Sequence, residues 1–181
     1  LSTGSSQGGP SGDLELSSGT SDSGTSGSIS VGAGSSNAVN GADVQLSAGD
    51  ASGQGLGGAL LLNAGVGEEG GDVQIRAGNG RAGDGGSLTL QAGQASINGE
   101  GGSVRVLSGS SAAASSGPVS LSSGVVESDE GQSGNVHIQS GASTGGVSGN
   151  VVIGTGNAPQ RQAGGIHLQA GSGSTGGNVD L

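Results

Sequence analysis

The sequence of 181 residues contains no cysteine, methionine, phenylalanine, tyrosine or tryptophan. Without cysteine the chain cannot form a disulfide, a thiolate metal site or a cysteine nucleophile. Lysine is also absent, and four arginines stand against fourteen acidic residues, which gives a formal net charge of −10. Nucleic-acid binding needs a basic surface and usually aromatic stacking, and both are missing. An anionic membrane surface would repel the chain, and no apolar run approaches the ~18 residues of a membrane span.

Small residues make up much of what is present. Glycine supplies 45 positions and serine supplies 33. On composition alone, such a chain resembles low-complexity linkers and disordered segments. The placement of the few aliphatic residues argues against a linker, because they recur at a nearly fixed period.

The repeat reads glycine, any residue, aliphatic, any residue, aliphatic, any residue, small residue, glycine. Its twelve copies are GDLELSSG at 12–19, GSISVGAG at 27–34, ADVQLSAG at 42–49, GALLLNAG at 58–65, GDVQIRAG at 71–78, GSLTLQAG at 86–93, GSVRVLSG at 102–109, GPVSLSSG at 117–124, GNVHIQSG at 134–141, GNVVIGTG at 149–156, GGIHLQAG at 164–171 and GNVDL at 177–181. Successive copies begin 13 to 17 residues apart. Glycine opens every copy except the one at Ala42, and it closes all eleven complete copies.

Apolar and polar residues alternate within each copy, which is typical of a β-strand with one buried face. Glycine brackets each such strand, and a short fixed period is typical of solenoids. The sequence therefore predicts an all-β fold, a β-solenoid (β-helix) of about twelve flattened coils of about 15 residues, continuous over 1–181 and cut in mid-coil at both ends. We call the paired aliphatic positions the apolar ladder and expect them to form a buried core: Leu14, Leu16, Ile29, Val31, Val44, Leu46, Leu60, Leu62, Val73, Ile75, Leu88, Leu90, Val104, Val106, Val119, Leu121, Val136, Ile138, Val151, Ile153, Ile166, Leu168, Val179 and Leu181.

A second regularity predicts a facing sheet of small residues. The residue two places after the closing glycine is Gly, Ala or Ser in ten of eleven copies, with Val126 the exception. Small side chains there would let two sheets lie closer than the usual ~10 Å. One coil buries too little to offset the entropy of ordering about 15 residues. Stability would therefore come from stacking, either within a longer array or end to end with other copies of the chain.

Acidic residues do not form a regular set of metal ligands. Aspartate precedes the first aliphatic residue only at Asp13, Asp43, Asp72 and Asp180. The acidic pairs Glu68/Glu69 and Asp129/Glu130 lie in segments between copies. We expect solvated carboxylates, with no metal and no cofactor, and keep a calcium-dependent β-roll-like module as an alternative.

The sequence also offers no catalytic constellation. His137 and His167 occupy outward positions two copies apart, with Val152 between them, so we expect them roughly 9–10 Å apart and facing solvent. No aromatic platform accompanies the carboxylates, as a glycosidic site would usually need. We therefore predict no catalytic residue and no enzymatic activity. An ice-binding solenoid is a further alternative, although only seven threonines occur and the outward positions are irregular.

The copies, of which GDVQIRAG at 71–78 is typical, are similar to the Gly/Ser-rich β-solenoid arrays of large secreted surface or filament proteins. These include filamentous-haemagglutinin-like adhesins and surface proteins of microalgae. The resemblance implies a stalk, so no functional residue carries over. We expect a structural, non-enzymatic protein that forms a rigid extracellular rod at the cell surface, in a filament shaft or stalk. Its partner would be a second copy of itself, without nucleic acid or membrane insertion, and its Ser/Thr-rich turns could accept O-linked glycan.

Overall fold

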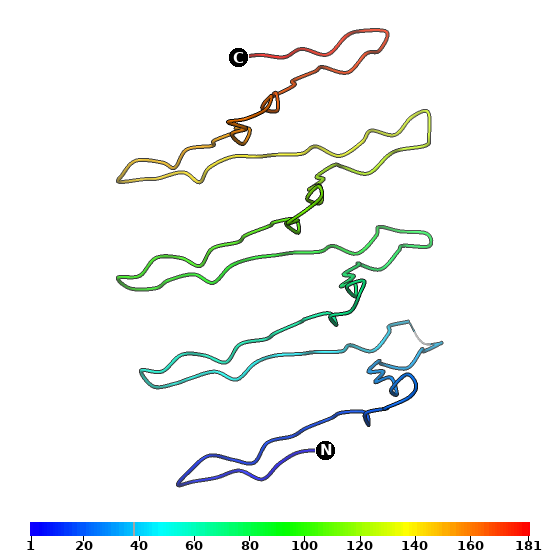
Figure 1. Ribbon diagram of the computed structural model, residues 1–181, viewed down its shortest axis with the longest axis vertical. Coiled ribbons are helices and arrows are strands. Elements are labelled where there is room, and N and C mark those ends of the chain that lie inside the picture. Colours follow the sequence, from blue (N-terminus) through cyan, green and yellow to red (C-terminus); the bar gives the residue numbers. More distant parts are fainter. Residues whose placement is uncertain (38) are drawn as a thin grey trace. The chain divides into compact units, whose positions relative to one another are not determined.

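The computed structural model describes residues 1–37 and 39–181. Across these residues the chain forms no helix and no strand, and it consists of extended segments joined by short bends (Figure 1). The predicted all-β solenoid is therefore wrong. A β-stack needs neighbouring coils about 4.8 Å apart and joined by a ladder of backbone hydrogen bonds. In the described part of the chain no such ladder forms, so the β-solenoid and β-helix assignments are both overturned.

The sequence repeat nevertheless appears in the structure, as a repeat of loops. Bends or turns recur along the chain, at 7–9, 22–24, 37, 39–40, 53–55, 67–69, 81–83, 97–99, 112–114, 128–130, 144–146, 159–161 and 173–175. Each lies in a segment outside the aliphatic pairs, and most of these segments are rich in Gly and Ser, although 157–163 (NAPQRQA) contains neither. The copies themselves are free of bends and run as the extended segments that join one loop to the next (Figure 1).

One backbone hydrogen bond closes the base of several loops, and we call this closure the loop neck. The amide of the glycine that opens a copy donates to the carbonyl oxygen of the glycine that closes the previous one. The N···O distances are 2.9 Å for Gly58 to Gly49, 3.0 Å for Gly71 to Gly65, 2.9 Å for Gly86 to Gly78, 2.9 Å for Gly102 to Gly93, 3.2 Å for Gly117 to Gly109 and 3.3 Å for Gly177 to Gly171. The loop that turns at 159–161 instead contains a tight turn in which the Arg161 amide donates to the Ala158 carbonyl at 3.1 Å.

Lack of space explains the glycine that opens four of the copies, at Gly58, Gly71, Gly86 and Gly102. A Cβ on Gly102 would lie 3.2 Å from the amide nitrogen of Gly93 and 3.3 Å from the Cβ of Ala92. A Cβ on Gly58 would lie equally close to Gly49 and Ala48. No glycine in the described chain has a positive φ, so the neck glycines are needed for close approach and not for a left-handed backbone.

The small residue two places after the closing glycine belongs to the turn that follows it. At Ser21, Ser111 and Ser143 the hydroxyl oxygen accepts a hydrogen bond from the amide three residues later, with N···O distances of 3.1, 2.9 and 3.0 Å. Where it is Gly80, an added Cβ would collide with the carbonyl oxygen of Gly83. The predicted facing sheet of small residues is therefore wrong, because the turn itself sets their size.

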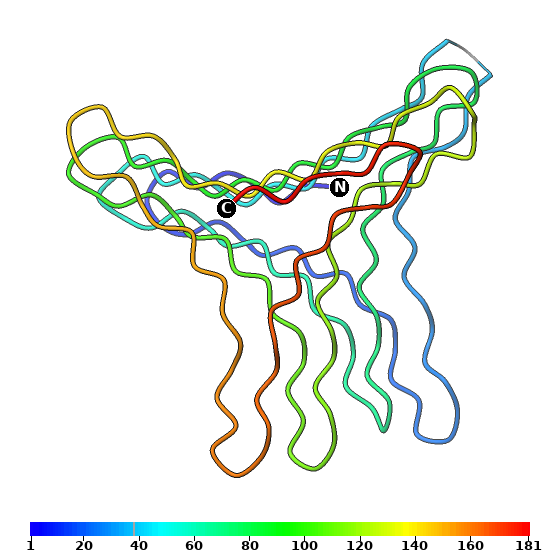
Figure 2. The same cartoon turned by 90° about the horizontal axis from the view of Figure 1, so that it is seen from above.

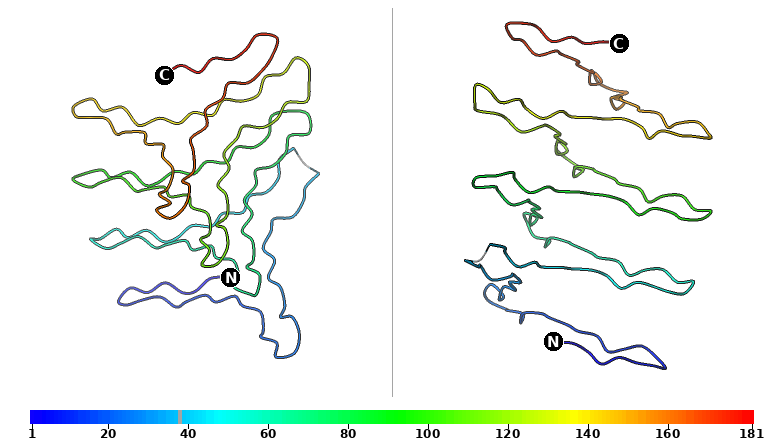
Figure 3. Two further views of the ribbon diagram at one scale, coloured as in Figure 1. Left: turned by 45° about the horizontal axis from the view of Figure 1, so that its top comes forward. Right: turned by 180° about the vertical axis from the view of Figure 1, so that it is seen from behind.

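The chain divides into two compact units, Leu1–Thr89 and Leu90–Leu181. In the first unit, the loops turning at 7–9, at 22–24 and around 37 point in different directions, and the loops at 53–55, 67–69 and 81–83 repeat those directions in the same order (Figures 2 and 3). In the second unit, the loops at 144–146, 159–161 and 173–175 likewise repeat the directions of those at 97–99, 112–114 and 128–130 (Figure 2). Within each unit a full turn therefore takes three copies, whereas the sequence predicted one coil per copy.

Candidate functional site

The apolar ladder remains exposed in the structure. Its least exposed member is Val179, at 46% of its full accessible surface. In the described part of the chain no hydrophobic residue is buried, so the expected core is not observed. The ladder instead forms a series of open apolar faces, one on each extended segment.

Side chains alternate locally along these segments, as the sequence predicts. Leu60 and Leu62 are 56% and 61% exposed, whereas Leu61 between them is 78% exposed. Polar side chains two residues apart meet on the opposite side, where the Arg76 Nη2 donates to the Gln74 Oε1 at 3.0 Å. His167 Nε2 and Gln169 Oε1 lie 3.2 Å apart in the same way. Along 58–65, neighbouring side chains therefore differ in exposure as on an unpaired strand, whereas Val106 and Leu107 in 102–109 are equally exposed, at 72% and 71%.

The whole chain exposes 18,049 Å² of surface. A compact folded monomer of its mass, 16.5 kDa, would expose about 7,500 Å², and a fully unfolded chain about 24,000 Å². The hydrophobic effect scales with the apolar area removed from water. In this conformation an isolated chain removes little apolar area from water, so the hydrophobic effect stabilises it only weakly. Most of its apolar surface remains exposed to solvent.

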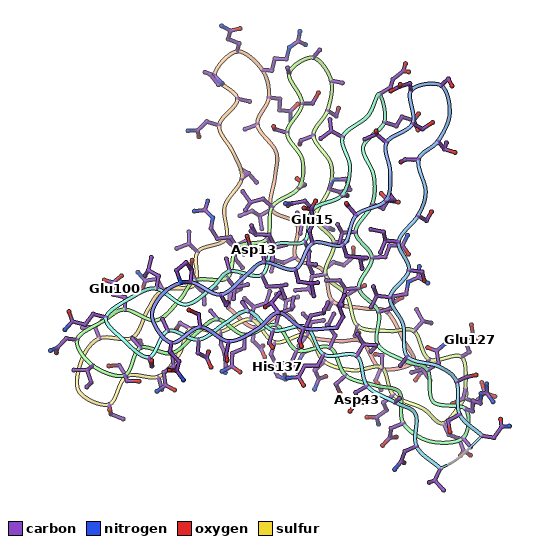
Figure 4. The ribbon with its side chains drawn as sticks, turned by 90° about the horizontal axis from the view of Figure 1, so that it is seen from below. Asp13, Glu15, Asp43, Glu100, Glu127 and His137 are labelled. Atoms are coloured by element: carbon purple, nitrogen blue, oxygen red, sulfur yellow. The ribbon has the colours of Figure 1, made fainter. Side chains whose placement is uncertain are left out.

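The ionisable side chains do not converge on a reactive centre. In the second unit, Glu100 and Glu127 lie near different loops, and His137 lies apart from both on an extended segment (Figure 4). In the first unit, Asp13 and Asp43 lie on separate segments (Figure 4). Among the described residues no three His, Asp or Glu side chains come together as a group that could hold a metal ion.

The two acidic pairs and the second histidine are placed as follows. Glu68 and Glu69 form part of the bend at 67–69, and Asp129 and Glu130 form a turn. All four are exposed. His167 lies on the segment between the loops at 159–161 and 173–175, so it follows a different loop from His137, which lies on the segment after 128–130. The structure therefore does not stack the two histidines in the way a one-copy coil would.

A shallow surface hollow occurs at the turn of 158–161. It is lined by Ala158, Pro159, Gln160 and Arg161, which are consecutive residues of one turn. Proline at the second turn position has the fixed φ that a tight turn requires. The hollow is therefore a product of local turn geometry, with no side chain from another segment reaching into it.

In the described residues no helix is long and apolar enough to cross a membrane. The chain matches no protein-family model, no curated protein and no solved structure.

Sequence reasoning missed the two groups that shape the loops, namely the neck glycines and the turn-capping serines. A signal for the necks was present. Where alanine precedes the closing glycine and a glycine pair opens the next copy, a close neck forms, as at Ala64 with Gly71 and at Ala92 with Gly102. For the caps, the signal was a serine three residues before the end of a Gly-rich turn, as in Ser21 with Gly24. Ser128 caps the longest loop in the same way by accepting from Gly131.

Proposed function

We propose that the chain is a structural, non-enzymatic repeat protein that contributes to the shaft or stalk of an extracellular filament. The observation that supports this is the repetition itself. Extended segments with one apolar face alternate with loops throughout the described residues. An enzyme or a specific receptor needs a few polar groups gathered in a concave site. Here each copy instead repeats its neighbour, as in repeat proteins that span distance.

The proposed partner is a second copy of the same chain. Repeat proteins gain stability from contact between like units, and one unit cannot bury its own apolar face. Contact end to end, as the sequence suggests, would extend the array. The loops carry many exposed serines and threonines, and O-linked glycan on them would leave the ladder faces unaltered.

Immunogold electron microscopy tests this proposal. Antibodies raised against the chain should label filaments or stalks on the outer surface of the cells that produce it. A matched control uses the same antibodies after adsorption with the purified chain, which should abolish the label. Label confined to the cell interior would contradict the proposed function.

A further inference from the structure

We infer that the apolar ladder is the surface through which copies of this chain associate, along their length, while the loops stay outside the contact. This inference rests on the proposed function, because it identifies how the proposed self-assembly takes place. It differs from end-to-end contact, since the ladder residues are spread evenly over all twelve copies of the repeat.

The exposed area shows that a large covering surface is needed. The chain exposes about 10,500 Å² more than a compact monomer of its mass, from 18,049 Å² against about 7,500 Å². Standard protein interfaces bury about 1,600 Å² in total, and obligate ones about 2,000–5,000 Å². One interface of obligate size would cover only part of the excess. An assembly that covered this excess would therefore give each chain more than one neighbour, as in a filament and unlike a dimer.

The backbone of the ladder segments is available for such contacts. The backbone hydrogen bonds of the described residues lie at the loop necks and at the turn of 158–161. The neck bonds join only the terminal glycines of successive extended segments, and none involves the backbone of an apolar-ladder residue. An extended segment with unpaired amides and carbonyls and one apolar face is a template for a strand from another chain.

The irregular spacing of the copies favours a second copy over an unrelated protein. Successive first aliphatic residues are 15, 15, 16, 13, 15, 16, 15, 17, 15, 15 and 13 residues apart. A partner that contacts many segments at once must match this series. A parallel, in-register copy matches it at every step, and it places like aliphatic residues side by side, as in other stacks of identical segments.

Most of the acidic charge lies outside the ladder: nine of the fourteen acidic residues are in the loops, and five, Asp13, Glu15, Asp43, Asp72 and Asp180, lie on ladder segments. The acidic pairs Glu68/Glu69 and Asp129/Glu130 lie in the loops between copies, outside the ladder segments. A contact along the ladder therefore does not need to bury these carboxylates, which would be costly without a partner cation.

Sedimentation velocity over a concentration series tests the inference, with two triple variants of matched chemistry. The ladder variant carries Ile75→Ser, Leu90→Ser and Val106→Ser. The loop control carries Leu56→Ser, Ile97→Ser and Val147→Ser, which removes from the loops three apolar side chains of the same types, 83–98% exposed against 59–72% at the ladder positions. We expect the ladder variant to weaken association by about tenfold or more and the control to change it by less than about twofold.

A second substitution separates backbone pairing from apolar contact. Thr89→Pro removes one amide hydrogen from the segment between Leu88 and Leu90 and leaves both ladder side chains in place. It should weaken association, whereas Gln94→Pro in the following loop should not. Circular dichroism should show β-structure that increases with concentration in the wild type and less so in Thr89→Pro.

The outcomes distinguish the inference from the proposed function. If the wild type associates and the ladder and loop variants weaken it equally, the ladder is not the contact surface, and the proposed function still stands. A wild type that stays monomeric at high concentration overturns the inference, whether the monomer is compact or unfolded. The immunogold result then decides the proposed function separately.

Discussion

At the scale of single residues, the glycines in this chain differ in how much space a Cβ atom would have. The neck glycines face a small side chain and a backbone amide across the base of a loop. Other glycines lie in open space, such as Gly70, where an added Cβ would meet nothing within 4 Å. Two neighbouring glycines can therefore have different tolerance to substitution, and the sequence alone does not separate them.

Gly71→Val should open the loop neck, and Gly70→Val should not. A Cβ on Gly71 lies 3.3 Å from the amide nitrogen of Gly65 and 3.5 Å from the Cβ of Ala64, so valine would force the two ends of the loop apart. Loss of the bond from the Gly71 amide to the Gly65 carbonyl removes about 0.5–1.5 kcal/mol of local stabilisation. Amide hydrogen exchange by NMR should show faster exchange at residue 71 by roughly two- to tenfold. Equal exchange in both variants would contradict the neck assignment.

At the scale of elements, the sequence predicted the local conformation but not its pairing. Alternation along 58–65 and 71–78 is set by the backbone geometry of an extended chain, so it could be predicted from the order of residues. The loops between the copies could be placed from Gly and Ser content in the same way. Pairing between segments depends on which partner is present, and the sequence of one chain does not contain that information. The predicted solenoid assumed that the chain supplies its own neighbours.

The exposure of the apolar ladder was not predicted from the sequence. Its residues were expected to form a buried core, yet even Val179 remains nearly half exposed. Burial is a property of the covering partner as much as of the residue. The turn caps, such as Ser111, depend on a bend whose geometry the composition does not specify.

In the associated protein, trypsin should cleave arginines in the loops faster than arginines on the extended segments. The chain has four arginines and no lysine, so trypsin has four sites. Arg76 and Arg105 lie on extended segments, whereas Arg81 and Arg161 lie in bends. If segments are covered on association and loops are not, cleavage after Arg81 and Arg161 should persist while cleavage after Arg76 and Arg105 slows by about tenfold or more.

Mass spectrometry of the fragments measures this prediction directly. The dilute protein is the control, and there all four sites should be cut at similar rates, because all four arginines are exposed. Rapid cleavage after Arg105 in the concentrated, associated protein would show that the segments stay open in the assembly.

At the scale of the whole molecule, net charge opposes the contacts that the apolar ladder favours. Each chain carries a formal charge of −10 at neutral pH. Parallel, in-register copies bring like charges near one another, and such repulsion is relieved by salt. The balance between a uniform negative charge and a repeated apolar face should make assembly sensitive to solution conditions.

Association should therefore strengthen with salt and with acid. Raising the ionic strength from about 0.01 M to about 0.15 M shortens the Debye length from about 30 Å to about 8 Å and screens the repulsion between chains. Lowering the pH from 7 toward the isoelectric point, about 4.1, takes the net charge from −10 toward zero. Light scattering across a grid of salt and pH measures both effects.

A charge variant provides the matched comparison for this last prediction. Replacing Glu68, Glu69 and Glu130 with glutamine and Asp129 with asparagine removes four negative charges from two loops and changes the net charge from −10 to −6. These residues lie outside the ladder, so the apolar contact is unaltered. The variant should associate more tightly than the wild type at pH 7 and low salt, and the difference should shrink at about 0.15 M ionic strength as screening takes over. Association that weakens on adding salt would instead mean that attraction between opposite charges, and not the apolar ladder, holds the copies together.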